Sequence, residues 1–368
     1  MFRFRCSMFR VHGSAVPQVH ALGEPGTPNL EQERFYNRSV VIETSAPTRI
    51  DLAGGTIDIW PLYLFHPGAQ TINVAISLRA RARLESRTDS RIVIHSRDTE
   101  TTVEAEDWKA LRHEPRLRLL SLLVHFFEAR GLTLTTTSES PAGAGIAGSS
   151  ALNVAVCAAL AEWTRQRYEP EALLQVAMNV EAQTIMVPTG LQDYRPALYG
   201  GLAALELEVD GIRRLPLKVD VHELERRIVL CYTGEPRNSG TNNWEITKKH
   251  IDGDAFVFDC FERIRDTAAI MREALIKGDW DAVGRAIAEE WDNRKRLAPG
   301  VTTPAIDSLI ERALAAGAAS AKVCGAGGGG CLFAYGPPDR RAAVRDALAA
   351  GGARILDYRI ERHGLTRG

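Results

Sequence analysis

The sequence predicts a mixed fold of the α+β class, and two kinds of segment carry that prediction. Between residues 71 and 84 an apolar residue occupies every second position, which is typical of a strand with one buried face. Between 279 and 297, Val283, Ile287 and Trp291 recur at helical spacing. We therefore expect a first half rich in strands and a second half of helices laid on a small sheet.

Regular structure in the first half is expected to begin near residue 39, with two short strands in 39–53 separated at Pro47. Strands are also predicted at 91–95 and 132–137, and residues 202–219 predict a hairpin that turns at Asp210-Gly211. Helical patterns occupy 116–129, which Gly131 ends, and then 149–167 and 170–186.

The second half is expected to begin with a strand at 228–233. Helical patterns then cover 243–276, 279–297, 303–316 and 338–350. Two short strands, AKVCG and CLFAY, enclose a run of four glycines, and ARILDYRI predicts a last strand.

Composition excludes several classes of function. The formal net charge is −1, so no field of the whole chain attracts nucleic acid or an anionic membrane. No apolar run reaches the roughly 18 residues that a membrane helix needs. The six cysteines lack the spacing of a metal site and suit reduced, buried thiols. We expect a cytoplasmic protein with no membrane or nucleic-acid partner, and residues 1–38, rich in Pro and Gly, to be a disordered extension.

The stretch SESPAGAGIAGSSALNVAV, residues 138–156, contains the pattern G-x-G-x-x-G. A dinucleotide fold would need a second parallel strand after the next helix, but another helix is predicted there. A Walker A loop would need a lysine where Ser149 stands. A third interpretation is a helix N-terminus that binds an anion, and a simple glycine turn capped by Ser149 or Ser150 stays open beside it.

Two other segments bear on that choice. APTRIDLAGGTIDIW, residues 46–60, has a strand entered at a proline, a double glycine and then Asp58. AKVCGAGGGGCLFAY, residues 321–335, has five glycines within six positions between apolar strands. Such a run weakens a fold unless the backbone must pass close to something, and a flexible linker would not be enclosed by strands.

In this order, the three segments resemble the GHMP kinase superfamily of galacto-, homoserine, mevalonate and phosphomevalonate kinases, over about residues 40–360. The resemblance implies a two-domain fold: an ATP-binding domain like ribosomal protein S5 at 39–220 and a ferredoxin-like α/β domain at 221–368. AGGTIDIWPLY, TGLQDYRPALYGGL and TGEPRNSG are most similar to heptose 7-phosphate kinases and related sugar kinases. They imply ATP-dependent phosphorylation of a sugar or sugar phosphate, with the anomeric hydroxyl as the expected acceptor.

The resemblance also implies roles for residues. Asp193 would take or orient the acceptor proton, and Arg49 would stabilise the transferring phosphoryl group. Ser149 and Glu181 would hold Mg²⁺. ATP would contact Pro141, Gly143, Ala144, Gly145, Ile146, Ala147, Gly148, Ser149 and Ser150, with Trp108 beside the adenine. The acceptor would contact Gly55, Asp58, Arg237, Ser239, Gly327 and Gly328.

Residue types alone leave purely structural interpretations of these positions open. Glu181 also suits a solvated helix face, Asp193 a turn, and Arg49 a strand surface. Arg237 and Ser239 suit an ordinary polar loop, and Trp108 a buried packing position.

Other functions are also weighed. A mevalonate-pathway kinase or decarboxylase of the same fold is disfavoured by the sugar-like context of Asp58. A sensor that binds ATP without turnover would not need Ser149, Glu181, Asp193 and Arg49 together. An NAD-dependent oxidoreductase is disfavoured by the missing second strand, and NADH binding in a fluorescence titration would restore it as an alternative. The sequence leaves a monomer or a homodimer equally open.

Overall fold

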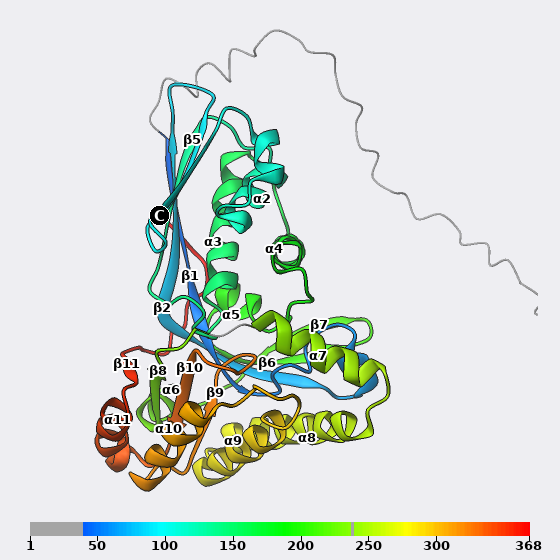
Figure 1. Cartoon of the computed structure of the whole chain (residues 1–368), viewed down its shortest axis with the longest axis vertical. Helices are drawn as coiled ribbons and strands as arrows, with labels where there is room; N and C mark the ends of the chain where they lie inside the picture. The colour runs from blue at the N-terminus through cyan, green and yellow to red at the C-terminus, as the bar shows by residue number, and fades with distance from the viewer. Residues whose placement is uncertain (1–39, 237–238) are drawn as a thin grey trace, which may run out of the picture.

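The computed structural model describes residues 40–236 and 239–368, the first four residues of the second range by backbone only. The extension expected at 1–38 and the predicted site residue Arg237 lie outside these ranges. The spine of the fold is one long antiparallel pair, β1 (Val41–Ala53) and β2 (Gln70–Ser86), which runs through much of the length of the molecule (Figure 1). The alternation at 71–84 therefore predicts β2 correctly.

The spine belongs to an eight-stranded sheet with the order β12-β1-β2-β5-β3-β4, and β6 pairs with both β2 and β7. Pairing is antiparallel except between β3 and β5. The added strands are β3 (Ile92–Ser96), β4 (Thr101–Ala105), β5 (Leu132–Ser138), β6 (Leu202–Glu208), β7 (Gly211–Pro216) and β12 (Thr366–Arg367). As predicted, the β6–β7 hairpin turns at Asp210-Gly211.

Helices cover one face of this sheet beside the upper part of the spine (Figure 1). They are α2 (Arg118–Phe126), α3 (Gly148–Trp163), α4 (Pro170–Ile185) and α5 (Tyr194–Tyr199). The helix α3 is apolar on nearly all sides, so it lies in the centre and contacts β1, β2 and α4. Its position fixes the loop before it, residues 139–147, at the end of a buried helix.

A second, four-stranded antiparallel sheet has the order β11-β8-β10-β9. Its strands are β8 (Ile228–Tyr232), β9 (Ser320–Val323), β10 (Cys331–Tyr335) and β11 (Arg354–Leu356). The helices of this half are α6 (Val221–Arg227), α7 (Ser239–Ile251), α8 (Ala255–Lys277), α9 (Trp280–Arg294), α10 (Pro304–Ala315) and α11 (Arg341–Ala350). The expectation of helices on a small sheet is confirmed.

Three elements differ from the predictions. Pro47 does not break the first strand, because the register with β2 shifts directly after it and a bulge absorbs the irregularity. The pattern at 243–276 forms two helices, since the Asp254 side chain accepts from Phe256 and Val257 and caps a new start. The last strand keeps only three residues, and the chain then runs beside β2, where Ser77 N donates to Arg359 O at 2.9 Å.

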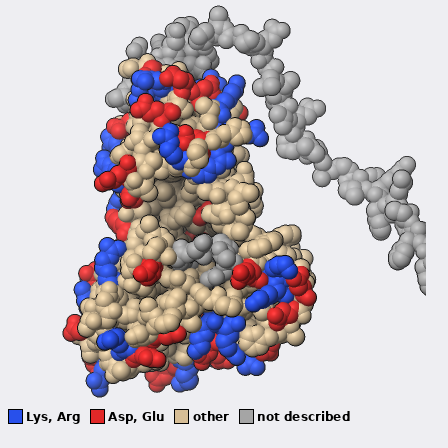
Figure 2. Space-filling model, in the orientation of Figure 1, with Lys and Arg blue, Asp and Glu red and all other residues tan. Residues whose placement is uncertain are grey.

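Short elements were missed. They include β4, α5, α6, β12 and the 3₁₀ helices η1 (Leu62–Phe65), η2 (Trp108–His113) and η3 (Pro338–Arg340). Segments this short carry little periodicity. Among the described residues, no helix has both the length and the apolar character needed to cross a membrane. In Figure 2, charged side chains gather towards the two ends of the visible face, and the described residues visible between them are mostly uncharged.

Candidate active site

The loop between β5 and α3 has the backbone of an anion-binding site. Gly143, Gly145 and Ala147 have φ values of 66°, 78° and 61°, so alternate residues are left-handed. Such alternation points successive N–H groups towards one place, and the N-terminus of α3 at Gly148 adds its dipole. The loop therefore fits the phosphates of a nucleotide.

Arg49 joins this loop to Asp193. Its Nη1 donates to Gly145 O at 2.9 Å, and its backbone N–H donates to Ile146 O at 3.0 Å. Its Nε and Nη2 donate to Oδ1 of Asp193 at 3.1 and 2.5 Å. The side chain is 1% exposed, so the strand-surface interpretation of Arg49 is wrong.

The charge of Arg49 is secured by its neighbours. Burial alone would lower the pKa of the guanidinium, but the carboxylates of Asp193 and Asp51 outweigh this effect and raise the pKa. Arg49 is thus a permanent cation between the loop and a carboxylate.

Asp58 lies against the segment that leads to Asp193. Its Oδ2 accepts from Gln192 N at 2.9 Å, and a Cβ on Gly190 would lie 2.4 Å from the same oxygen. Its Oδ1 is buried without a hydrogen-bond partner. Burial, and then the charge of Asp193, raise the pKa of Asp58 to about 7. The structure therefore brings these two predicted carboxylates together.

Glu181 is a buried carboxylate beside the first turn of α3. Its Oε2 accepts from Ser150 Oγ at 3.1 Å and from Tyr194 OH at 2.7 Å. Burial raises its pKa, and hydrogen bonds from the hydroxyls of Tyr194, Ser149 and Ser150 act in the opposite direction. A carboxylate surrounded by hydroxyls next to a phosphate loop suits Mg²⁺, which prefers few protein ligands together with phosphate and water.

The C-terminal glycine run reaches the loop through its last member. Cys331 N donates to Ala144 O at 2.6 Å, and a Cβ on Gly330 would lie 2.7 Å from that oxygen. The predicted residues Gly327 and Gly328 instead lie against Val301, whose carbonyl accepts from Gly328 N at 2.8 Å. Close backbone approach thus explains the glycines, as expected, and Gly330 is the one that meets the loop.

The other predicted residues lie in different surroundings. Gly55 packs against two charged side chains, since a Cβ there would lie 2.4 Å from Arg294 Nη1 and 2.8 Å from Asp51 Oδ2. Trp108 lies in η2 beside His125, with ring centroids 5.1 Å apart, and packs on the core under α2. Ser239 is the first residue of α7, and its side chain is outside the described part.

Sequence reasoning missed a buried cluster of charges behind Arg49. It consists of Asp51, Glu290, Arg294 and Lys322, each at most 2% exposed. A signal was present, because Asp51 stands in the strand RIDLA and Lys322 in AKVCG, where apolar residues would be usual. The cluster lies within reach of Arg49, whose Nη1 is 3.6 Å from Asp51 Oδ1.

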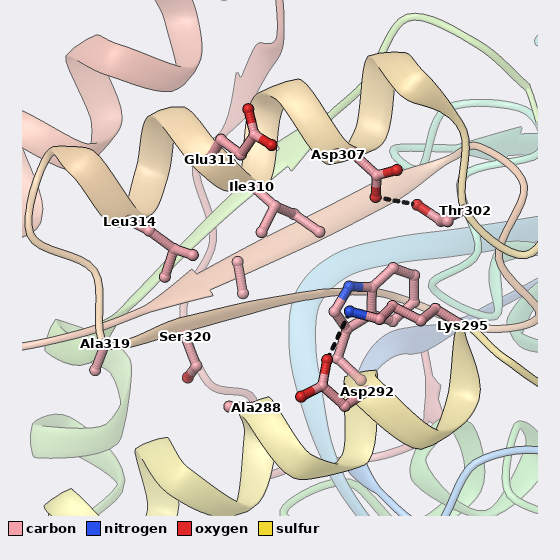
Figure 3. A pocket seen from close by; sticks show the side chains of 12 residues that line it. Ala288, Asp292, Lys295, Thr302, Asp307, Ile310, Glu311, Leu314, Ala319 and Ser320 are labelled. Carbon is pink, nitrogen blue, oxygen red and sulfur yellow. Dashed lines mark hydrogen bonds and ion pairs between the residues drawn. The ribbon is translucent and has the colours of Figure 1, made fainter.

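Two pockets of about 610 Å³ are present in the described part of the chain. One lies between α9, α10 and β9, and none of the predicted site residues lines it (Figure 3). The other is bordered by Leu191, Tyr194 and Arg195 from the segment around Asp193, together with Trp60 and Tyr63. The second pocket is therefore the one next to the candidate chemistry.

Comparison with known proteins gives two family matches. Residues 116–201 match the N-terminal domain of the GHMP kinases, and residues 271–354 match their C-terminal domain. The first match contains the phosphate loop, Glu181 and Asp193, and the second contains the glycine run.

Individual relatives agree with these matches. The chain is 29% identical to the D-glycero-alpha-D-manno-heptose 7-phosphate kinase of Campylobacter jejuni, over 88% of this chain and 98% of that protein. It is 27% identical to the L-fucokinase/L-fucose-1-P guanylyltransferase of Bacteroides fragilis, over 87% of this chain but 36% of that longer protein. The crystal structure of a D-glycero-D-manno-heptose 1-phosphate kinase from Bacteriodes thetaiotaomicron superposes with a TM-score of 0.72 at 24% identity, over 89% and 98% of the two chains.

Proposed function

We propose that the chain is a GHMP kinase and that it transfers the γ-phosphoryl group of ATP to a hydroxyl of a heptose phosphate or a closely related sugar. The choice of a sugar phosphate over other acceptors is supported by the heptose 7-phosphate kinase relative, which matches nearly its whole length. The anomeric hydroxyl is the proposed acceptor position.

One observation carries the chemical part of the proposal. Arg49 donates at the same time to the carbonyl of Gly145, in the phosphate loop, and to the carboxylate of Asp193. Phosphoryl transfer needs charge neutralisation and alignment more than covalent help. A fixed guanidinium between the loop and a carboxylate supplies both.

The step can be written with the residues present. The acceptor oxygen attacks the γ-phosphorus, the bond to the bridging oxygen of ADP breaks, and the hydroxyl proton passes to the Asp193 carboxylate. Backbone N–H groups of the loop hold the phosphates, and Arg49 offsets the charge on the phosphoryl oxygens. Asp58 lies beside Asp193 and is proposed to bond a hydroxyl of the acceptor.

Mg²⁺ is proposed to be held by Glu181 and Ser149. When bound, it would neutralise charge on the β- and γ-phosphates. Glu181 fits this role because hydroxyls of the first turn of α3 orient its carboxylate.

The proposal is tested by ADP release from ATP and Mg²⁺ with a panel of acceptors: heptose 7-phosphate, fucose, galactose, glucuronate, arabinose, mevalonate and homoserine. Release with a sugar or sugar phosphate, lost in Asp193→Asn and kept in Asp210→Asn, is the expected result. Asp210 is a matched control because it is an exposed aspartate paired with Arg213 in a hairpin turn. ATP binding without release for any acceptor would favour a sensor instead.

A further inference from the structure

We propose that Asp51 is a positioning residue that fixes the guanidinium of Arg49 and the start of the C-terminal glycine run in one arrangement. The proposal rests on the proposed function only in naming what Arg49 does. The contacts that hold Asp51, Arg49 and Gly325 together do not depend on that function.

Each carboxylate oxygen of Asp51 has two partners. Oδ1 accepts from Gly325 N at 3.0 Å and faces Arg49 Nη1 at 3.6 Å. Oδ2 accepts from Arg294 Nη1 at 2.8 Å and faces Lys322 Nζ at 3.5 Å. Asp51 therefore joins four groups and is not one half of a single ion pair.

The Asp51 carboxylate is charged although it is fully buried. Burial alone would raise the pKa of Asp51, but Lys322, Arg49 and Arg294 and the Gly325 N–H hold the pKa well below its usual range. Counting Asp193 and Glu290, three carboxylates face three cations around Arg49. Buried ion pairs are weak sources of stability, so a precise arrangement is the better reason for keeping one.

The first residue of the glycine run is held at both its backbone N–H and its backbone carbonyl. Asp51 binds Gly325 N, and Arg294 Nη2 donates to Gly325 O and to Thr56 Oγ1. Arg294 and Glu290 lie one turn apart on α9, whereas Asp292 of the same helix and Lys295, the residue directly after it, line the pocket of Figure 3. The cluster thus lies on a different face of α9 from that pocket.

These contacts close a ring around the phosphate loop. One series of contacts leads from Asp51 through Arg49 to Gly145 O and Asp193. The other series leads from Asp51 to Gly325 N and follows the backbone of the glycine run to Cys331 N, which donates to Ala144 O. Both sets of contacts begin at one carboxylate, so loss of its charge should loosen Arg49 and Gly325 together.

The test compares Asp51→Asn with Glu290→Gln. Both variants remove one negative charge from the same buried cluster, so both should lower the melting temperature. Within the described part of the chain, Glu290 contacts Lys322, Gly54 N and, at 3.8 Å, Arg294, but not Arg49, which makes it the matched control. Because small misplacements of a catalytic group are costly, kcat should fall about 10- to 100-fold in Asp51→Asn with the KM for ATP within about threefold of wild type. Glu290→Gln should keep kcat within about threefold of wild type.

A second measurement does not depend on activity. The guanidinium Nε–H signal of Arg49 in ¹H–¹⁵N spectra, assigned by its loss in Arg49→Lys, should move in Asp51→Asn and stay in place in Glu290→Gln. If Asp51→Asn does not fold, Arg294→Lys replaces it in both measurements, because lysine keeps the charge but cannot bridge Asp51, Thr56 and Gly325. An unmoved Arg49 signal, or an equal fall of kcat in both charge variants, would overturn the role of Asp51. A wild-type protein that is inactive on every acceptor would contradict the proposed function, and the Arg49 signal would still decide this inference.

Discussion

Arg49 and Asp193 are 144 residues apart in the sequence, and two nitrogens of the Arg49 guanidinium donate to one oxygen of Asp193, at 3.1 and 2.5 Å. Arg49 comes from β1, and Asp193 directly precedes α5. The same guanidinium holds the carbonyl of Gly145. Phosphate loop and carboxylate are therefore kept at a fixed separation by one side chain.

This relationship predicts that Arg49→Lys is not a conservative change. A lysine keeps the positive charge but loses the planar fork that reaches Gly145 O and Asp193 together. We expect kcat to fall by about 10- to 1,000-fold while the protein keeps its fold. Steady-state kinetics beside a thermal unfolding curve would test this, and a kcat within twofold of wild type would contradict it.

Glu181 predicts a specific dependence on magnesium. Glu181→Gln should raise the Mg²⁺ concentration for half-maximal activity by about tenfold or more, because a carboxylate ligand is lost. In wild type that concentration should fall as pH rises, since burial raises the pKa of Glu181 and protons compete with the cation. Glu162→Gln, an exposed position on α3, serves as the control. Equal magnesium titrations for the two variants would exclude Glu181 as a ligand.

Gly330 predicts an effect transmitted by the backbone. In Gly330→Ala the new Cβ would lie 2.7 Å from Ala144 O and 2.8 Å from Gly143 O, so the phosphate loop must shift. We expect a higher KM for ATP together with lower stability. Gly352→Ala is the matched control, because its φ of +90° carries the same left-handed strain with nothing within 4 Å of the Cβ. If both variants lose stability equally and neither changes the KM for ATP, contact with the loop has no role.

Asp58 predicts a pH dependence of stability. Its pKa of about 7 in the folded protein lies above the value of 3.8 expected when it is unfolded. Between these values the folded state binds more protons, so the contribution of Asp58 to stability falls as pH rises from about 4 to 7. Asp58→Asn removes that loss. Urea unfolding at pH 5 and pH 8 should show the variant gaining on wild type by about 2 kcal/mol at the higher pH. A constant difference between the two pH values would contradict the raised pKa.

Local patterns in the sequence predicted most of the fold. Strict alternation predicted β2, helical spacing predicted α9 and α10, and Asp210-Gly211 predicted the β6–β7 turn. Two departures from the predicted elements have a local structural cause. A bulge lets β1 pass Pro47, and the Asp254 cap divides a long helical pattern into α7 and α8. The effect of a proline or a cap depends on partners that a local pattern does not contain.

The site could be predicted only in part. Resemblance pointed to Arg49 and Asp193, which the structure brings into contact. It did not distinguish among neighbouring glycines, because only the three-dimensional path shows that Gly330 meets the loop and Gly327 meets Val301. The cluster around Asp51 was missed because its members come from β1, α9 and β9, and their pairing is decided by how the two sheets pack.

We propose above all that the pair of Arg49 and Asp193 directs phosphoryl transfer to a sugar phosphate. The most direct test incubates the protein with ATP, Mg²⁺ and heptose 7-phosphate and follows both products by ³¹P NMR. We expect ADP and one new sugar-phosphate signal in equal amounts, with a rate about 10²- to 10⁴-fold lower in Asp193→Asn. ADP without a phosphorylated sugar, or an Asp193→Asn variant as fast as wild type, would contradict it.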